Sequence, residues 1–240
     1  MRYFVEFAYN GSDFHGSQSQ PNGITVQATM EQAFATILRE PIALTFAGRT
    51  DAGVHARQMF AHFDTNISHA ILNTITPRLN NLLPASIAIA RIFPVADDLH
   101  ARFSARSRTY EYHIRTTKDP FAQGFSARVT PDLDFDRMNE AAQSLLGKQD
   151  FASFCRVHTD VKTTFCTVFE AYWKNNVFTI TADRFLRNMV RAIVGTLIEV
   201  GRGRLTPEQF REIIAAHNRC KAGQSAPAEG LYLTHIEYNF

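Results

Sequence analysis

The sequence contains little cysteine and no apolar run long enough to cross a membrane. Its three cysteines, Cys155, Cys166 and Cys220, are odd in number and lack metal-ligand spacing, so we expect reduced thiols in a cytosolic protein. Arg2 and Glu6 interrupt the first apolar stretch, and no continuous apolar segment follows where a secretory signal peptide needs one. No segment approaches the roughly 20 apolar residues of a transmembrane helix. These features predict a cytoplasmic protein without a membrane partner.

Signatures of several enzyme classes are absent as well. There is no Gly-x-x-x-x-Gly-Lys phosphate loop and no Gly-x-Ser-x-Gly nucleophile turn. The run Gly201-Arg202-Gly203 lacks the rest of a dinucleotide fingerprint and is typical of a helix-ending turn. His55 and His62 have no cysteine or histidine partners that would complete a metal site, so we expect no bound metal.

Charge is nearly balanced over the whole chain but uneven along it. The formal net charge is +2 over 240 residues, which neither predicts nor excludes a nucleic-acid partner. Residues 102–115 hold four arginines and one acidic residue, and residues 184–204 hold five arginines and one acidic residue. Local basic stretches in a nearly neutral protein are typical of positive charge that lines one cleft.

The periodicity of the apolar residues predicts strands and helices in both halves of the chain. Strands are expected at residues 2–8, 42–46, 57–63, 87–93, 110–115, 168–174, 177–182 and 231–238. Helices are expected at residues 26–38, from Thr76-Pro77, at 138–146 before Gly147, at 184–200, and from the capping box at Thr206. The pair Asn175-Asn176 is expected to turn a hairpin.

The repeated plan of the two halves predicts the α+β class. We expect two pseudo-symmetric α+β lobes, ferredoxin-like or RRM-like, that share a central, mainly antiparallel sheet with a cleft between them. The first lobe is expected at residues 1–104 and the second at residues 105–240. A hydrophobic content of 45% is enough for a sizeable core in a chain of this length.

The run from Ala47 to Ala56, Ala-Gly-Arg-Thr-Asp-Ala-Gly-Val-His-Ala, is the most specific motif in the chain. It places Asp51 between two Ala-Gly pairs, which allow a sharp bend and the close approach of a large ligand. Arg49 stands two positions away, and a nearby guanidinium keeps a carboxylate ionised and oriented. This is how an aspartate nucleophile is built, although the same letters also describe an ordinary tight turn with a solvated arginine.

Two further groups of residues could complete a site around Asp51. Tyr110 begins a strand beside several arginines, where it could stack on a flipped base, or be an ordinary strand aromatic like Tyr112. On the helix expected at residues 184–200, the side chains of Arg184, Arg187 and Arg191 would share one face without a neutralising acid. Such a face favours phosphate binding or pairing with a distant carboxylate, and its alternative is a solvated helix surface.

These motifs resemble the tRNA pseudouridine synthase A (TruA) family over nearly the whole chain. The resemblance lies in the Asp51 run, in the segment Phe185–Gly195 and in Ala228–Leu233. It implies an isomerase that converts uridine to pseudouridine at positions 38, 39 and 40 of the tRNA anticodon stem-loop, as a homodimer, with no cofactor or metal. It further implies that Asp51 is catalytic, that Arg191 pairs with it and that Tyr110 contacts the target base. Our own hypothesis is that the target nucleotide flips out of the stem and that Arg49 fills the gap and helps to hold it.

One position departs from the pattern of this family. After the first strand the family usually has glycine, a large aromatic residue and glutamine, and this chain has Gly16-Ser17-Gln18. From the sequence alone we expect this substitution to affect how the loop packs or touches RNA rather than the chemistry. An RNA-binding module without catalysis and a hydrolase are the alternatives, although the former leaves Arg49 and Asp51 without a purpose and the latter lacks a second carboxylate.

Overall fold

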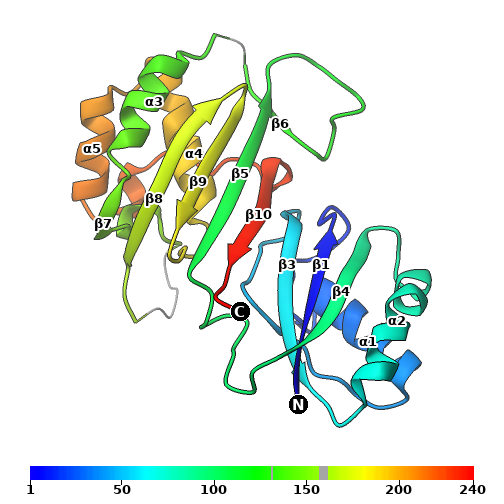
Figure 1. Ribbon diagram of the computed structural model, residues 1–240. Helices are drawn as coiled ribbons and strands as arrows, with labels where there is room; N and C mark the ends of the chain where they lie inside the picture. Colours follow the sequence, from blue (N-terminus) through cyan, green and yellow to red (C-terminus); the bar gives the residue numbers. More distant parts are fainter. Residues whose placement is uncertain (131, 157–161) are drawn as a thin grey trace. The chain divides into compact units, whose positions relative to one another are not determined.

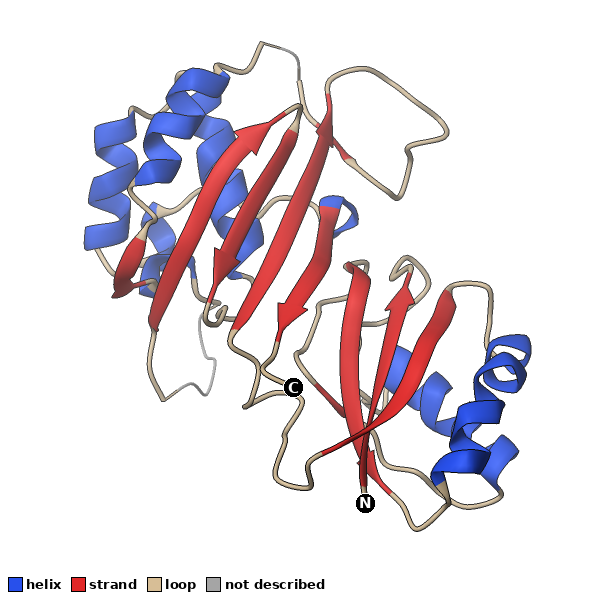
Figure 2. Cartoon of the chain, in the orientation of Figure 1, coloured by secondary structure: helices blue, strands red, loops and turns tan. Residues whose placement is uncertain are grey.

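The computed structural model describes residues 1–130, 132–156 and 162–240, which form two compact units. The first unit contains residues 1–106 and 232–240, and the second contains residues 107–231. Both units contain strands and helices, and most strand neighbours run antiparallel, so the chain belongs to the α+β class (Figure 2). The pseudo-symmetry of the lobes stays a prediction.

The first unit is a sheet with two helices packed on one of its faces (Figure 1). Its strands follow the order β4-β1-β3-β10, in which β1 is antiparallel to both neighbours, β10 is parallel to β3, and the short β2 pairs with β3. The strands are β1 (Arg2–Tyr9), β2 (Thr45–Phe46), β3 (His55–Asp64), β4 (Ile87–Val95) and β10 (Leu231–Glu237). The helices are α1 (Val26–Leu38) and α2 (His69–Leu82).

Helix α1 has the bounds that its apolar spacing predicts, and α2 does not. The Thr25 side chain accepts the Ala28 amide at the start of α1, and Arg39 ends it in a left-handed conformation with φ of 62°. Helix α2 was expected to start at Thr76-Pro77, but it starts at His69 and holds the proline inside. Packing outweighs the lost proline hydrogen bond, because the side chains on one face of α2 are buried at helical spacing. These are Leu72, Ile75 and Leu79.

The last strand joins the first unit, although the sequence analysis placed residues 105–240 together in the second lobe. Tyr232 and Leu233 of β10 pair with the start of β3. The Tyr238 ring packs edge-on against Phe4 and Phe60, with ring centroids 5.4 Å and 5.2 Å away. Burial of these aromatic rings explains why the chain returns to its first unit.

The second unit is a four-stranded antiparallel sheet with three helices on one face (Figure 1). Its order is β5-β9-β8-β7, and β6 runs parallel to β5 at the end of that strand. The strands are β5 (Ser107–Arg115), β6 (Ala127–Arg128), β7 (Gly147–Asp150), β8 (Phe165–Lys174) and β9 (Val177–Ala182). The helices are α3 (Phe135–Gln143), α4 (Met189–Gly201) and α5 (Pro207–Ala215).

Local turn and cap chemistry confirms several expected boundaries in this unit. Asn175 and Asn176 have φ of 50° and 63° between β8 and β9, as the expected hairpin requires. Thr206 and Gln209 form both hydrogen bonds of the capping box at the start of α5. Helix α3 lies three residues earlier than expected, because Asp134 caps it by accepting the Arg137 amide.

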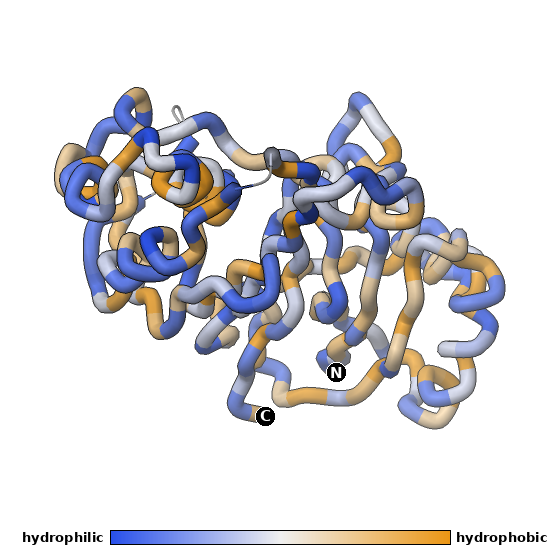
Figure 3. Tube along the Cα trace, turned by 90° about the horizontal axis from the view of Figure 1, so that it is seen from above, coloured by the Kyte–Doolittle hydropathy of each residue, from blue (hydrophilic) through white to orange (hydrophobic). Residues whose placement is uncertain are grey.

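No helix in the described residues is long and apolar enough to span a membrane. Apolar residues are spread along the trace in short stretches (Figure 3). The core of the first unit is rich in buried aromatic side chains, including Tyr3, Phe4, Phe34 and Phe63. The core of the second is centred on α4, whose side chains are buried almost all round.

Candidate active site

Asp51 lies in a loop of the first unit between β2 and β3. The Ala47 amide donates to the Phe60 carbonyl at 2.8 Å as the loop begins, and the Val54 amide donates to the Asp51 carbonyl at 3.2 Å. Gly53 has φ of 78°, a left-handed conformation that glycine adopts at little cost. Asp51 is partly exposed.

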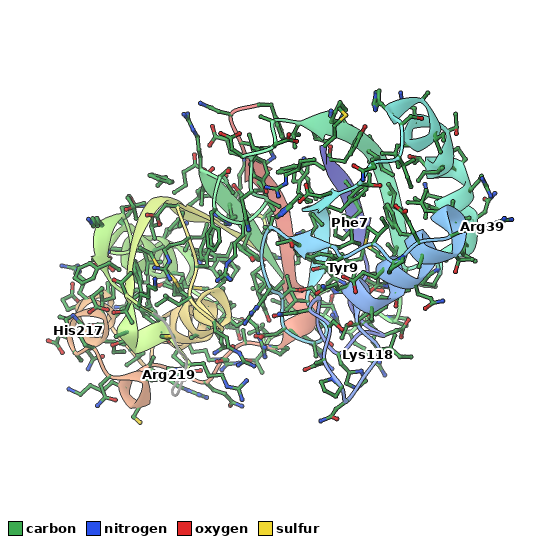
Figure 4. The ribbon with its side chains drawn as sticks, turned by 90° about the horizontal axis from the view of Figure 1, so that it is seen from below. Phe7, Tyr9, Arg39, Lys118, His217 and Arg219 are labelled. Atoms are coloured by element: carbon green, nitrogen blue, oxygen red, sulfur yellow. The ribbon has the colours of Figure 1, made fainter. Side chains whose placement is uncertain are left out.

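Thr50, the residue before Asp51, is held by the segment that follows β1. Its amide donates to the Ser17 hydroxyl at 2.8 Å, and its carbonyl accepts the Ser17 amide at 3.2 Å. The Thr50 hydroxyl lies 2.8 Å from that of Tyr9, in a hydrogen bond that either can donate. The rings of Tyr9 and Phe7 lie next to each other on β1 (Figure 4). Both backbone polar groups and the side chain of Thr50 are therefore engaged.

The far end of the loop is fixed by a close backbone contact and a buried histidine. The Gly11 amide donates to His55 Nδ1 at 3.1 Å, and a Cβ at Gly11 would overlap the Val54 carbonyl oxygen. The buried His55 ring stacks on Tyr232 with centroids 4.6 Å apart. His55 therefore supports the loop. In the described part of the chain, no group of three or more histidine, cysteine or acidic residues could hold a metal ion.

Tyr110 and Tyr112 point to the same face of β5 in the second unit but differ in exposure. Tyr110 pairs with Ile180, is partly exposed, and meets the Phe185 ring edge-on with centroids 4.9 Å apart. Tyr112 is buried, and its hydroxyl donates to the Pro227 carbonyl at 2.8 Å. Burial raises the pKa of Tyr112 above its ordinary value. Tyr112 is thus a core residue, whereas the Tyr110 ring is accessible.

The expected arginine face of α4 is wrong for two of its three members. The helix begins at Met189, so Arg184 and Arg187 precede it and share no helical face with Arg191. The Asp183 carboxylate accepts the Arg184 amide at 2.7 Å and holds this stretch outside the helix. Arg184 is partly exposed and Arg187 is exposed, so both remain candidates for phosphate contacts.

Arg191 lies in the first turn of α4 and is tied to the segment that runs along the helix. Its Nε donates to the Ala226 carbonyl at 2.7 Å, and its own carbonyl accepts the Ala226 amide at 2.9 Å. The segment can come this close because Gly195 has no side chain, and a Cβ there would overlap the Gln224 carbonyl oxygen. This reciprocal pair of hydrogen bonds holds the backbone of Arg191 and, through Nε, its guanidinium group.

The candidate residues divide between the two units. Arg49, which is exposed, and Asp51 belong to the first unit. Tyr110, Arg184, Arg187 and Arg191 belong to the second unit. The expected ion pair between Asp51 and Arg191 stays a prediction.

Comparison with known proteins identifies the family. The profile described as tRNA pseudouridine synthase matches residues 141–239. The chain is 51% identical to the tRNA pseudouridine synthase A of Bacteroides fragilis over 99% of its own length and 96% of the relative. It is 52% identical to that of Parabacteroides distasonis over the same shares, and 40% identical to that of Halalkalibacterium halodurans over 96% and 90%. The chain belongs to the tRNA pseudouridine synthase A family.

Two structural supports of this tRNA pseudouridine synthase A family member were missed by the sequence analysis. The only indication of the Ser17–Thr50 contact in the sequence is the small polar residue at position 17, where a large aromatic residue was expected from the family resemblance. The contact of Ala226 with Arg191 has one indication as well, a glycine at position 195 in the middle of an apolar helical pattern. Neither signal names the partner, which lies far away in the sequence.

Proposed function

We propose that this chain acts at uridines 38, 39 and 40 of the tRNA anticodon stem-loop, with Asp51 as its nucleophile. As a member of its family, the chain is an isomerase that converts uridine to pseudouridine in tRNA. The observation that supports the site is the Asp51 loop, in which the partly exposed Asp51 follows Thr50, whose two flanking peptide groups both form hydrogen bonds with Ser17. A nucleophile held in this way loses little conformational freedom when it reacts.

The reaction exchanges one bond at the ribose C1′ for another. The C1′–N1 bond breaks, the uracil rotates, and a C1′–C5 bond forms. C5 then loses its proton and N1 gains one, so the product is an isomer of the substrate. Asp51 either attacks C1′ as the C1′–N1 bond breaks and is displaced when C5 bonds to C1′, or it assists the departure of the base through the sugar without bonding to C1′. In both routes Asp51 must be ionised, which pairing with Arg191 would favour.

The other candidate residues bind the substrate in this proposal. The target nucleotide leaves the stem, Arg49 fills the space and holds the extruded nucleotide, and the accessible Tyr110 ring stacks beneath the base. Arg184 and Arg187 contact phosphates. The active form is a cytoplasmic homodimer that needs neither cofactor nor metal.

The proposal is tested with an anticodon stem-loop transcript that carries tritium at uridine C5. Wild type is expected to release tritium, because C5 loses its hydrogen in the product. Asp51→Ala and Asp51→Asn are expected to release none while they still bind the transcript. Turnover by Asp51→Asn would exclude Asp51 as the nucleophile. Tight binding without release by wild type, on several tRNAs, would reduce the chain to an RNA-binding module.

A further inference from the structure

Ser17 is a buried polar residue in the segment between β1 and α1. Its exposed fraction is 1%, and its hydroxyl accepts the Thr50 amide while its own amide donates to the Thr50 carbonyl. These two hydrogen bonds hold the peptide group before Thr50 and the one after it. The second of these peptide groups ends at the Cα of Asp51.

We propose that Ser17 is a positioning residue for isomerisation: its hydroxyl fixes the backbone from which Asp51 reaches the substrate. The inference rests on the proposed role of Asp51 as the nucleophile. Fixing both peptide groups of Thr50 fixes both of its backbone dihedral angles, and so fixes the position of the Asp51 Cα from which the carboxylate projects. Catalytic groups held near their productive geometry react faster because less freedom is lost on the way to the transition state.

Ser17 can do this because its own backbone is anchored to a helix. Its carbonyl accepts the Gln27 amide at 2.9 Å, and the Gly16 carbonyl accepts the Val26 amide at 3.4 Å. Both donors lie at the start of α1, where the Thr25 side chain caps the helix. The amides in the first turn of a helix have no hydrogen-bond partners inside the helix. In α1 they donate to the segment at Gly16 and Ser17, which in turn binds Thr50.

The contact also requires a close backbone approach. Gly16 has φ of 97°, and a Cβ there would lie 2.9 Å from the Thr50 carbonyl oxygen. The Tyr9 hydroxyl engages the Thr50 side chain from β1. Thr50 is thus held by three consecutive parts of one scaffold, the end of β1, the segment at Gly16 and Ser17, and, through that segment, α1.

The proposed role depends on the Ser17 hydroxyl. Ser17→Ala removes this hydroxyl, and Ser17→Thr keeps it. Steady-state turnover of full-length tRNA is measured for Ser17→Ala, Ser17→Thr and Asp51→Ala. Ser12→Ala is the matched control, because the exposed Ser12 hydroxyl donates to Asn10 in the same segment. We expect Ser17→Ala to lower kcat about five- to tenfold, as the loss of one neutral hydrogen bond would, with KM changed less than twofold. Ser17→Thr and Ser12→Ala keep most of the wild-type kcat.

Two outcomes would overturn the role of Ser17. One is a folded Ser17→Ala protein with the kcat of wild type, or with a loss confined to KM. The other is a folded Ser17→Thr protein as slow as Ser17→Ala. Turnover by Asp51→Ala would instead refute the proposed function, whatever the serine variants do.

Hydrogen exchange keeps the proposal testable if Ser17→Ala does not fold. In the wild-type protein the Thr50 amide is expected to exchange as slowly as the paired amides of β3, because the Ser17 hydroxyl accepts it. Exchange at the rate of an exposed loop would show that the hydroxyl does not hold this peptide group, and would overturn the proposal.

Discussion

At the scale of single residues, His62 shows how burial gives a titratable group a structural role. It lies in β3 with an exposed fraction of 6%, and its Nδ1 accepts the Ala101 amide at 3.2 Å. Burial, the charge of Arg2 and the neighbouring His100 lower its pKa to about 4, against a smaller opposite effect of Asp64. The folded protein therefore stabilises the neutral form of the His62 imidazole relative to the protonated form.

The lowered pKa of His62 predicts that the folded protein loses stability in mild acid. Above pH 6.5 the ring is neutral in both the folded and the unfolded chain. Between pH 6.5 and about 4, His62 is protonated in the unfolded chain but stays neutral in the folded protein. The free energy of unfolding therefore falls as the pH falls. The contribution of this group is on the order of 3 kcal/mol, and the loss is complete below its folded pKa.

The measurement is urea unfolding of wild type and His62→Asn at several pH values from 7.5 to 4, a range chosen as roughly the interval over which the linkage acts. Asparagine keeps a side-chain acceptor for the Ala101 amide but does not titrate. We expect the variant to depend less on pH than wild type over this interval, whatever its stability at pH 7. Equal slopes for the two proteins would mean that His62 is not the group responsible.

At the scale of elements, caps and turns were predictable from local sequence, whereas the start of α4 was not. The Thr206 capping box and the Asn175-Asn176 turn are decided by neighbouring residues, and both are as expected. The helical spacing continues backward from Met189 to Arg184, but Asn188 has φ of 66° and breaks the helix. Asp183 forms hydrogen bonds with Thr167 of β8 that compete with extension of the helix. Helical spacing alone does not predict this partner, because it lies outside the helical segment of the sequence.

Helix α4 also offers a test of why a glycine stands at its centre. Gly195→Ala would raise intrinsic helix propensity by about 1 kcal/mol. The new Cβ would overlap the Gln224 carbonyl oxygen, so the segment that bonds Arg191 must move away. We expect a net loss of about 1–3 kcal/mol in the free energy of unfolding, measured by urea titration, together with lower turnover. A more stable variant would show that the segment adjusts freely.

At the scale of the whole molecule, the sequence predicted the class, the motifs and the family but not the path of the chain. The resemblance carried by the Asp51 run and by Phe185–Gly195 is confirmed by the comparisons. The assignment of residues 232–240 to the first unit could not be predicted, because a strand pattern does not say which sheet edge it joins. The expected proximity of Asp51 to Tyr110 and Arg191 stays a prediction, because local sequence patterns do not determine contacts between residues distant in sequence.

The distribution of charge over the molecule yields a prediction about tRNA binding. Arg187→Ala is expected to weaken binding and to make the slope of log K against log salt concentration less steep by about one, because one fewer counterion is released. Arg211→Ala is the control, since it removes another exposed arginine of the second unit, on α5, which the proposal does not place on a phosphate. Equal salt slopes for wild type and Arg187→Ala would exclude a phosphate contact at this residue.

The return of the last strand to the first unit has a consequence for biosynthesis. Residues 1–106 leave the ribosome before the second unit, yet the aromatic rings of their core pack against Tyr238, which is made after that unit. The second unit, continuous in sequence, can complete its core earlier. At about 5–20 residues per second, the unfinished half with the Asp51 loop stays open for several seconds or longer. The first unit, with the Asp51 loop, is thus completed only after the whole of the second unit has been made.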